Sequence, residues 1–153
     1  MQIPKLPNTT RIHFQNVNGI NPLNYGTLCT AWHEMETDII LVNETKLDST
    51  QRKVQHMLMS KPRRLFGKQV QVIAGSTQIP APTRQKSGGV LAMVTGDTRA
   101  RVTEMGKDKH GHWVYAKLQG KTHNIMIITT YQVCEGHPHH SGPTTYATPL
   151  YTS

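Results

Sequence analysis

The sequence predicts one domain of the α/β class, in which two strand–helix units precede a run of short strands. The chain has 153 residues, which suits a single domain with one core. Its first part alternates strand-like and helix-like apolar patterns. Its second part consists of short apolar segments separated by turn residues, which is typical of strands with tight connections.

The first unit is a strand followed by a helix. Residues 11–17 alternate between apolar and polar side chains and stop at Asn18-Gly19, a strong turn signal. A helix is expected over 22–36, with Asn21 as its N-cap and Pro22 at its first position. The side chains that recur at helical spacing, and so predict its buried face, are Leu23, Leu28, Ala31, Trp32 and Met35.

The second unit repeats this order. Residues 38–42 form a continuous apolar run, which indicates a strand covered on both faces. A helix is expected over 49–60, capped by Asp48 or Ser49 and ended before Pro62. The order strand, helix, strand, helix is what predicts the α/β class.

The rest of the chain is expected to be mostly β-structure. A strand is predicted over 69–74, followed by a polar loop over 77–86. Four more strands are predicted over 89–94, 100–104, 112–118 and 124–131, and their short connections imply an antiparallel meander. Residues 1–10 are interpreted as an extended lead-in, 11–134 as the folded domain and 135–153 as an irregular tail.

Composition narrows the classes of function. Lys and Arg number 17 against nine Asp and Glu, a net charge of +8, which favours polyanionic partners; an ordinary basic surface explains it almost as well. No apolar run reaches the roughly 18 residues of a membrane span, and no secretory signal is visible. Two cysteines are too few for a disulfide scaffold. We therefore expect an intracellular protein, nuclear or cytoplasmic, without a membrane partner.

Polar residues follow the two predicted buried strands. Asn16 and Asn18 end the first, and Asn43 and Glu44 end the second. If the strands are parallel neighbours, these residues share the sheet edge where open α/β sheets place ligands. Carboxylate and carboxamide oxygens suit Mg²⁺, which can bind a phosphate oxygen. The alternative is an ordinary Asn-Gly turn and a solvated glutamate.

The same segments carry a family resemblance. Residues 14–20 (FQNVNGI) and 38–46 (DIILVNETK), with 87–90 (SGGV) and 129–132 (TTYQ), resemble the endonuclease/exonuclease/phosphatase superfamily. Residues 112–114 (HWV), 131–134 (YQVC) and 142–146 (GPTTY) are most similar to its LINE-type retrotransposon endonucleases. The resemblance implies a two-sheet α/β sandwich of the deoxyribonuclease and apurinic/apyrimidinic endonuclease type. It also implies Mg²⁺- or Mn²⁺-dependent hydrolysis of a DNA phosphodiester.

The resemblance also assigns roles to residues. Glu44 is similar to the acidic metal ligand of the family, and Asn18 stands where relatives have Asn or Asp near that metal. Asn16 resembles the asparagine that orders the site, and Tyr131 the tyrosine that contacts the scissile phosphate. Two positions depart from the pattern, since glutamine is usual at position 43 and arginine is frequent at position 132.

The later family motifs are absent. No Asp follows Asp108, and Glu135 is the one acidic residue beyond it, so neither Asp-x-Asn nor Ser-Asp-His occurs. Those groups would orient the attacking water and polarise a general-base histidine. The chain thus resembles the N-terminal half of such a domain, an incomplete sandwich that a second polypeptide would complete. We expect this chain to lack activity; the alternative function is a basic nucleic-acid-binding remnant without catalysis.

Basic and histidine-rich segments offer further candidates. Arg63, Arg64, Arg84 and Lys86, with Lys61 and Lys68, are predicted as a phosphate-facing stripe at the rim of the site, or else as a solvated basic face. The segments 110–112 (HGH) and 137–140 (HPHH) could bind zinc or nickel, although a turn and a tail explain them better.

Overall fold

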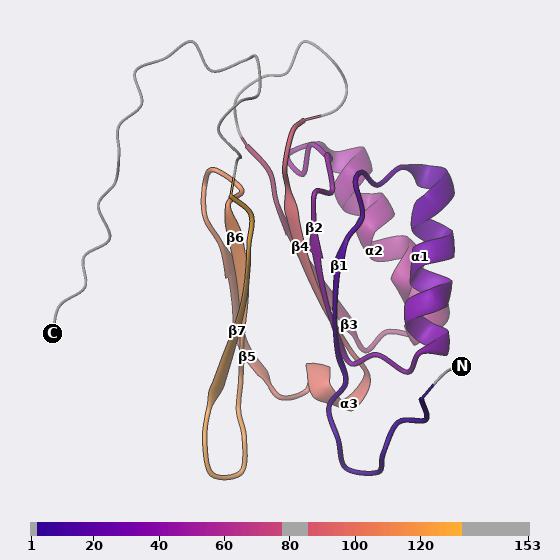
Figure 1. Ribbon diagram of the computed structural model, residues 1–153, viewed down its shortest axis with the longest axis vertical. Coiled ribbons are helices and arrows are strands. Elements are labelled where there is room, and N and C mark those ends of the chain that lie inside the picture. Colours follow the sequence, from indigo (N-terminus) through magenta and orange to yellow (C-terminus); the bar gives the residue numbers. More distant parts are fainter. Residues whose placement is uncertain (1–2, 78–85, 133–153) are drawn as a thin grey trace, which may run out of the picture.

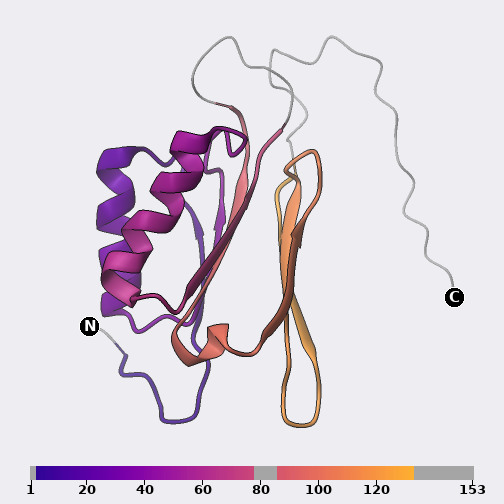
Figure 2. The same cartoon turned by 180° about the vertical axis from the view of Figure 1, so that it is seen from behind.

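The computed structural model describes residues 3–77 and 86–132. Two β-sheets lie face to face, and two helices cover the outer side of the larger sheet (Figure 1, Figure 2). The prediction of a two-sheet α/β sandwich is confirmed. In chain order the elements are β1 (Ile12–Asn16), α1 (Pro22–Glu34), β2 (Ile39–Asn43), α2 (Arg52–Phe66), β3 (Val70–Gly75), β4 (Val90–Thr95), α3 (Gly96–Arg99), β5 (Val102–Lys107), β6 (Trp113–Leu118) and β7 (Ile125–Thr130).

The larger sheet has the strand order β1-β2-β4-β3, and the smaller one has the order β5-β6-β7. β1 and β2 are parallel, with Asn16 beside Asn43, as the sequence predicted. β4 runs antiparallel to both of its neighbours, so Val90 at its start lies beside Asn43 and beside Gly75 at the end of β3. Four chain segments therefore meet at one end of this sheet, the upper end in Figure 1, which we call the site edge.

The core consists of two layers separated by the larger sheet. Ile40 and Val42 of β2 belong to the cluster between this sheet and the helices, together with Trp32. Ile39 and Leu41 belong to the cluster between the two sheets. β2 is thus buried on both faces, which explains why its sequence is a continuous apolar run rather than an alternating one.

Helix α1 begins at the predicted residue, and its buried face agrees with the prediction only in part. The side chain of Asn21 accepts hydrogen bonds from the backbone N–H groups of the first turn, and Asn24 completes a capping box. The buried residues are Tyr25, Cys29 and Trp32, whereas Leu23 is 89% exposed. The predicted face is therefore confirmed at Trp32, with Leu28 and Met35 packed against the core, and was wrong at Leu23 and Ala31, which are exposed.

Helix α2 runs through Pro62 to Phe66, so the prediction that it ends before the proline was wrong. A proline inside a helix leaves the carbonyl four residues earlier without its N–H donor. That carbonyl is the one of Leu58, and the buried hydroxyl of Tyr25 in α1 donates to it at 2.8 Å. Within the described residues, no helix is long and apolar enough to cross a membrane.

The predicted meander exists only in part. β5, β6 and β7 form it, while β3 and β4 join the larger sheet as an antiparallel pair. The short helix α3 connects the two sheets and was not predicted. Local patterns predict strands, but they carry no signal for the point at which the chain passes from one sheet to the other.

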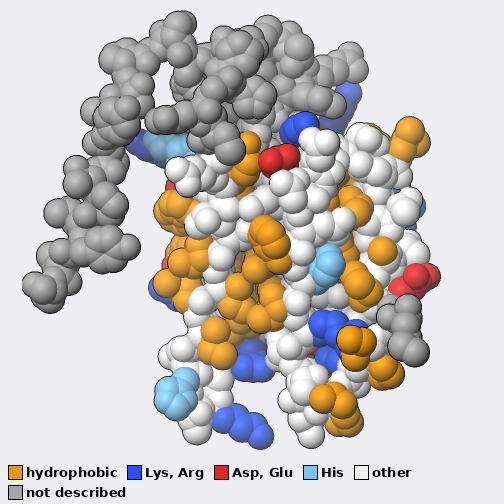
Figure 3. Space-filling model, viewed as in Figure 1, with side chains coloured by type: hydrophobic (Ala, Val, Ile, Leu, Met, Phe, Trp, Pro, Cys, Tyr) orange, Lys and Arg blue, Asp and Glu red, His pale blue; other side chains and the backbone are white. Residues whose placement is uncertain are grey.

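Both sheets have open edges that are apolar. On β1, Ile12 and Phe14 are 52% and 58% exposed, although their register partners in β2 are buried between the sheets. On β7, Ile125, Met126 and Ile128 are about half exposed. Figure 3 shows hydrophobic side chains gathered on this face of the molecule, where Figure 1 places β7 and β1. Such uncovered apolar sheet surface is what an incomplete sandwich would leave.

Candidate functional site

The loops that follow β1 and β2 are hydrogen-bonded to each other. The N–H of Gly19 donates to the carbonyl of Glu44 at 2.7 Å, and the N–H of Ile20 donates to the carbonyl of Thr45 at 2.8 Å. The parallel pairing thus continues beyond the strands themselves. It places Asn18 and Glu44 on adjacent segments of backbone, as expected for two residues that would share a ligand.

The backbone at this edge is unusual. Asn18, Glu44 and Lys46 have φ values of 48°, 55° and 54°, in the left-handed region that non-glycine residues seldom adopt. The carboxamide of Asn16 supports the first of these turns, because its Oδ1 accepts the N–H of Asn18 at 3.1 Å. Strained residues of this kind persist where the surrounding structure holds them, and they concentrate at functional sites.

The side chain of Lys46 crosses from the second loop to the first. Its Nζ donates to Oδ1 of Asn18 at 2.5 Å. The stem of Lys46 lies over Gly19, with its Cδ 3.6 Å from the position that a Cβ of Gly19 would occupy. Sequence reasoning did not single out Lys46, although it stands two residues after the predicted ligand Glu44.

Gly88 and Gly89 allow the segment before β4 to lie against the loop after β2. The N–H of Lys46 donates to the carbonyl of Gly88 at 2.8 Å, and that of Thr45 to the carbonyl of Gly89 at 3.3 Å. A Cβ on Gly89 would lie 2.4 Å from Oγ1 of Thr45, and one on Gly88 would lie 2.7 Å from the ring of Tyr131. Both glycines also have positive φ values. Only glycine fits here, so these close contacts explain the Ser-Gly-Gly motif.

Asn43 fastens the end of β7 to the site edge. Its Nδ2 donates to the carbonyl of Thr130 at 2.8 Å, and its Oδ1 accepts the hydroxyl of Thr129 at 2.8 Å. These bonds bring the next residue, Tyr131, to the same edge, where its ring packs against Gly88. Three of the predicted residues, Glu44, Asn18 and Tyr131, are therefore gathered within one set of contacting segments.

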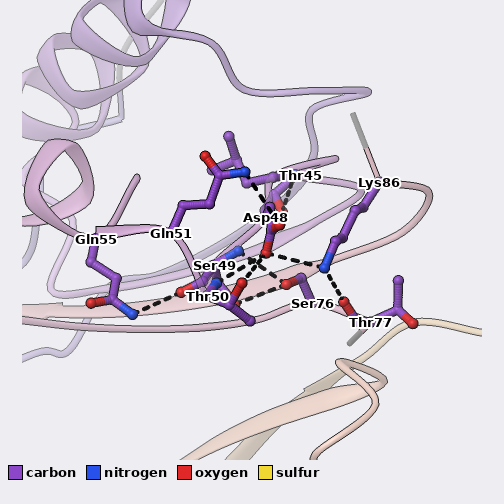
Figure 4. A network of polar contacts seen from close by, with 10 residues as sticks. Thr45, Asp48, Ser49, Thr50, Gln51, Gln55, Ser76, Thr77 and Lys86 are labelled. Atoms are coloured by element: carbon purple, nitrogen blue, oxygen red, sulfur yellow. Dashed lines mark hydrogen bonds and ion pairs between the residues drawn. The ribbon is translucent and has the colours of Figure 1, made fainter. Parts of the chain in front are cut away.

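Lys86 is buried rather than exposed at the rim. Its side chain is only 6% exposed, its Nζ lies 3.1 Å from Oδ1 of Asp48, and it donates to the carbonyl of Thr77 at 2.7 Å (Figure 4). Burial by itself would raise the pKa of Asp48, but hydrogen bonds from Thr50, Lys86 and Gln51 outweigh it and lower that pKa to about 2. The carboxyl group of Asp48 is thus ionised at neutral pH.

The same polar network ties the loop after β2 to the end of β3. The N–H of Ser49 donates to Oγ of Ser76 at 3.0 Å, and the carbonyl of Ser49 accepts the side-chain amide of Gln55 at 2.9 Å (Figure 4). Asp48 does not cap α2, contrary to the prediction; Gln51 holds that position without a side-chain bond. The network therefore links the loop after β2 to the end of β3, two of the segments that meet at the site edge.

Arg63 and Arg64, two other predicted phosphate contacts, are not at this edge. Arg63 and Arg64 are exposed in the last turn of α2. The chain then enters β3 at Val70, which pairs with Thr95 at the opposite end of the sheet. Arg84 lies outside the described residues. The buried Lys86 does not fit the expected phosphate-facing stripe.

One residue of the HGH and HWV segments, His112, lies near the site edge. His112 lies in the β5–β6 turn, where its carbonyl accepts the N–H of Tyr131 at 2.7 Å and its Nδ1 lies 3.4 Å from Oδ2 of Asp108. The other oxygen of Asp108 accepts the backbone N–H groups of His112 and Trp113. These bonds lower the pKa of Asp108 against the opposing effect of burial. The carboxylate of Asp108 therefore stabilises the β5–β6 turn by accepting its backbone N–H groups.

The donor set at the site edge fits a hard cation. Glu44 supplies one half-buried carboxylate and Asn18 one carboxamide oxygen, on adjoining loops. Oxygen donors of this kind suit Mg²⁺ or Mn²⁺ with several of its waters retained. Within residues 3–77 and 86–132, no group of three His, Cys, Asp or Glu side chains is placed to hold a metal. The His110–His112 pair, whose rings stack at 5.7 Å, therefore gains no third ligand there.

Known structures share this fold. An AP endonuclease from Leishmania major superimposes on 88% of this chain with a TM-score of 0.59 and 17% identity. An endonuclease/exonuclease/phosphatase family protein from Leptotrichia buccalis superimposes on 83% with a TM-score of 0.58 and 12% identity. This chain covers 46% and 57% of those two chains, about half of their length. No family model matches the sequence, and no curated protein sequence does.

Proposed function

From the endonuclease/exonuclease/phosphatase fold of the described residues, we propose that this chain carries the metal- and phosphate-binding part of a DNA endonuclease site. Glu44 and Asn18 hold Mg²⁺ or Mn²⁺, and Tyr131 with Asn16 helps to place the phosphodiester. The observation that carries the proposal is the backbone pairing of the two loops, which puts Asn18 beside Glu44. When bound, the ion would stabilise the charge that develops on the phosphate during cleavage.

Each residue has a separate task in this proposal. Glu44 provides the negative charge that attracts the ion, and the neutral oxygen of Asn18 adds a second ligand. Asn16 keeps the Asn18 turn in place through the bond between its Oδ1 and the N–H of Asn18. Tyr131, fixed over Gly88, is a phenol donor for a phosphate oxygen. The motifs shared with LINE-type endonucleases favour DNA of a retroelement target as the substrate.

We further propose that this chain binds DNA without hydrolysing it. Hydrolysis requires a base that accepts a proton from the attacking water. Within the described part of the chain, one histidine lies within 4 Å of a carboxylate, since Nδ1 of His112 is 3.4 Å from Oδ2 of Asp108. Asp108 already serves the backbone of its own turn, which makes the pair a poor substitute for a free base. This favours the alternative of a basic nucleic-acid-binding protein over an active nuclease.

Mn²⁺ titration followed by electron paramagnetic resonance tests the metal site. We expect Glu44→Gln to weaken Mn²⁺ binding at least about tenfold, because it removes the carboxylate of the site. Glu34→Gln is the matched control, since Glu34 is an exposed carboxylate at the end of α1. Equal Mn²⁺ binding by wild type and Glu44→Gln would refute the proposed site.

A plasmid-nicking assay with Mg²⁺ tests the second part. We expect salt-sensitive binding of the plasmid and no nicking by the wild type. Nicking by the wild type that Glu44→Ala abolishes would show that the chain is an active endonuclease and that its proton acceptor was misjudged.

A further inference from the structure

We propose that Lys46 makes the divalent cation and the DNA phosphate bind to the site edge together, because its ammonium opposes the cation alone and supports it once the phosphate is present. The inference rests on the proposed function and adds an order of binding to it. It assigns Lys46 a positioning and specificity role that neither the sequence patterns nor the fold likeness had suggested.

The contact that carries the inference lies on the candidate metal ligand itself. Nζ of Lys46 is 2.5 Å from Oδ1 of Asn18, the same oxygen that would face the cation. The backbone of Lys46 is fixed on both sides, since its N–H donates to Gly88 and its carbonyl accepts the N–H of Lys86 at 3.2 Å. The ammonium is therefore a built part of the site rather than a freely moving surface charge.

The charges at this edge do not balance when a cation binds alone. On the two loops, 16–20 and 43–46, Glu44 is the one acidic residue and Lys46 the one basic residue. The nearest further pair, Asp48 and Lys86, neutralises itself inside the fold. A divalent ion on Glu44 and Asn18 would thus face the ammonium across a single shared oxygen, with one carboxylate to offset three positive charges.

A phosphodiester removes this imbalance. An anionic oxygen of the phosphodiester can take the Lys46 ammonium away from Oδ1 of Asn18, which leaves that oxygen to the cation, and the ammonium and the cation can then both bind the phosphate. By thermodynamic linkage, the factor by which the cation tightens DNA binding equals the factor by which DNA tightens cation binding. Lys46 therefore sets the size of this coupling, while Glu44 sets whether the cation binds at all.

The test compares two binding measurements in the wild type and in Lys46→Gln, which keeps a hydrogen-bond donor but removes the charge. For Mn²⁺ without DNA, we expect Lys46→Gln to bind several-fold more tightly than wild type. For a short labelled DNA oligonucleotide, followed by fluorescence anisotropy at constant ionic strength, we expect Mg²⁺ to tighten wild-type binding by about fivefold or more. We expect Mg²⁺ to tighten DNA binding by Lys46→Gln clearly less than by the wild type, because only the direct attraction between the cation and the phosphate remains.

Two controls isolate the local effect. Lys68→Gln makes the same change in net charge at an exposed residue after α2, remote from the site edge, and should keep the wild-type response to Mg²⁺. An oligonucleotide with uncharged methylphosphonate linkages should lose the Mg²⁺ response in every variant, because it offers no anion to bridge the two positive groups.

The outcomes separate this inference from the proposed function. If Lys46→Gln weakens Mn²⁺ binding in the absence of DNA, or responds to Mg²⁺ as the wild type does, the coupling role of Lys46 is overturned. The metal site on Glu44 would still stand in that case. If Glu44→Gln binds Mn²⁺ as well as the wild type does, the proposed function itself fails.

Discussion

The buried pair of Lys86 and Asp48 is expected to stabilise the fold measurably. Lys86→Met removes the ammonium while it retains much of the side-chain length. The change leaves the Asp48 carboxylate without its ion-pair partner and the carbonyl of Thr77 without the bond from Lys86. Removing one member of a buried pair is costly because the other charge stays behind in a poorly solvated place.

The size of the effect follows from the contacts. Lowering the pKa of Asp48 from 3.8 to about 2 corresponds to about 2 kcal/mol of stabilisation at neutral pH. Thr50 and Gln51 still donate to Asp48 in the variant, so only part of this is lost. The loss of the hydrogen bond from Lys86 to the carbonyl of Thr77 adds about 1 kcal/mol. We expect Lys86→Met to lower the free energy of unfolding by about 2 kcal/mol.

The pH dependence has a defined sign. Because folding lowers the pKa of Asp48, its contribution is complete above pH 3.8 and is lost as the pH falls toward 2. In Lys86→Met the pKa of Asp48 rises, since burial then meets less opposition from hydrogen bonds. The variant should therefore lose stability at a higher pH than the wild type as acid is added.

Urea unfolding at pH 7, followed by circular dichroism, measures the cost. The cycle of Lys86→Met, Asp48→Asn and the double variant should give a coupling of about 1–2 kcal/mol. Lys68→Met is the control, since an exposed lysine should change the free energy of unfolding by less than about 0.5 kcal/mol. A Lys86→Met cost no larger than that of the control would refute the reasoning.

Three further predictions concern the fold around the site. Tyr25→Phe should cost about 1–2 kcal/mol in urea unfolding, because it leaves the Leu58 carbonyl without a donor; an unchanged stability would contradict this. Gly89→Ala should lower the free energy of unfolding by at least about 2 kcal/mol, and clearly more than Gly96→Ala, because Gly96 has a positive φ but no neighbour within 4 Å. Equal losses would mean that backbone strain acts without the steric clash against Thr45. We expect the exposed apolar edge of β1 to cause self-association, and Phe14→Thr, at a residue that is 58% exposed, should reduce it in sedimentation velocity with little change in stability; unchanged association would exclude this edge as the cause.

Much of the fold could be predicted because local patterns determined it. The Asn21–Pro22 start of α1 and the buried run of β2 each depend on neighbours in sequence, and both are confirmed. The end of α2 depends instead on a hydroxyl from α1, which no pattern around Pro62 reveals. The allocation of the strands to two sheets is likewise a property of packing between distant segments.

The candidate site divides in the same way. Asn18 and Glu44 could be placed at one edge because strand order and parallel pairing fix where strands end. Lys86 could not be placed, since whether a lysine faces solvent or a buried carboxylate depends on the side chain of Asp48 from another loop. The contact between Lys46 and Asn18 was missed for the same reason.

The two lysine contacts at the site edge should have separable effects, and this gives the site a testable design. Lys86 is buried, Asp48 is 17% exposed and their charges cancel, so removal of the pair should change stability while the electrostatic field at Glu44 changes little. Lys46 and Glu44 are more exposed, so their substitution should change ligand binding at a small cost in stability. If single substitutions at Lys86, Asp48, Lys46 and Glu44 all changed ligand binding and stability together, the two lysine contacts would not have separate roles.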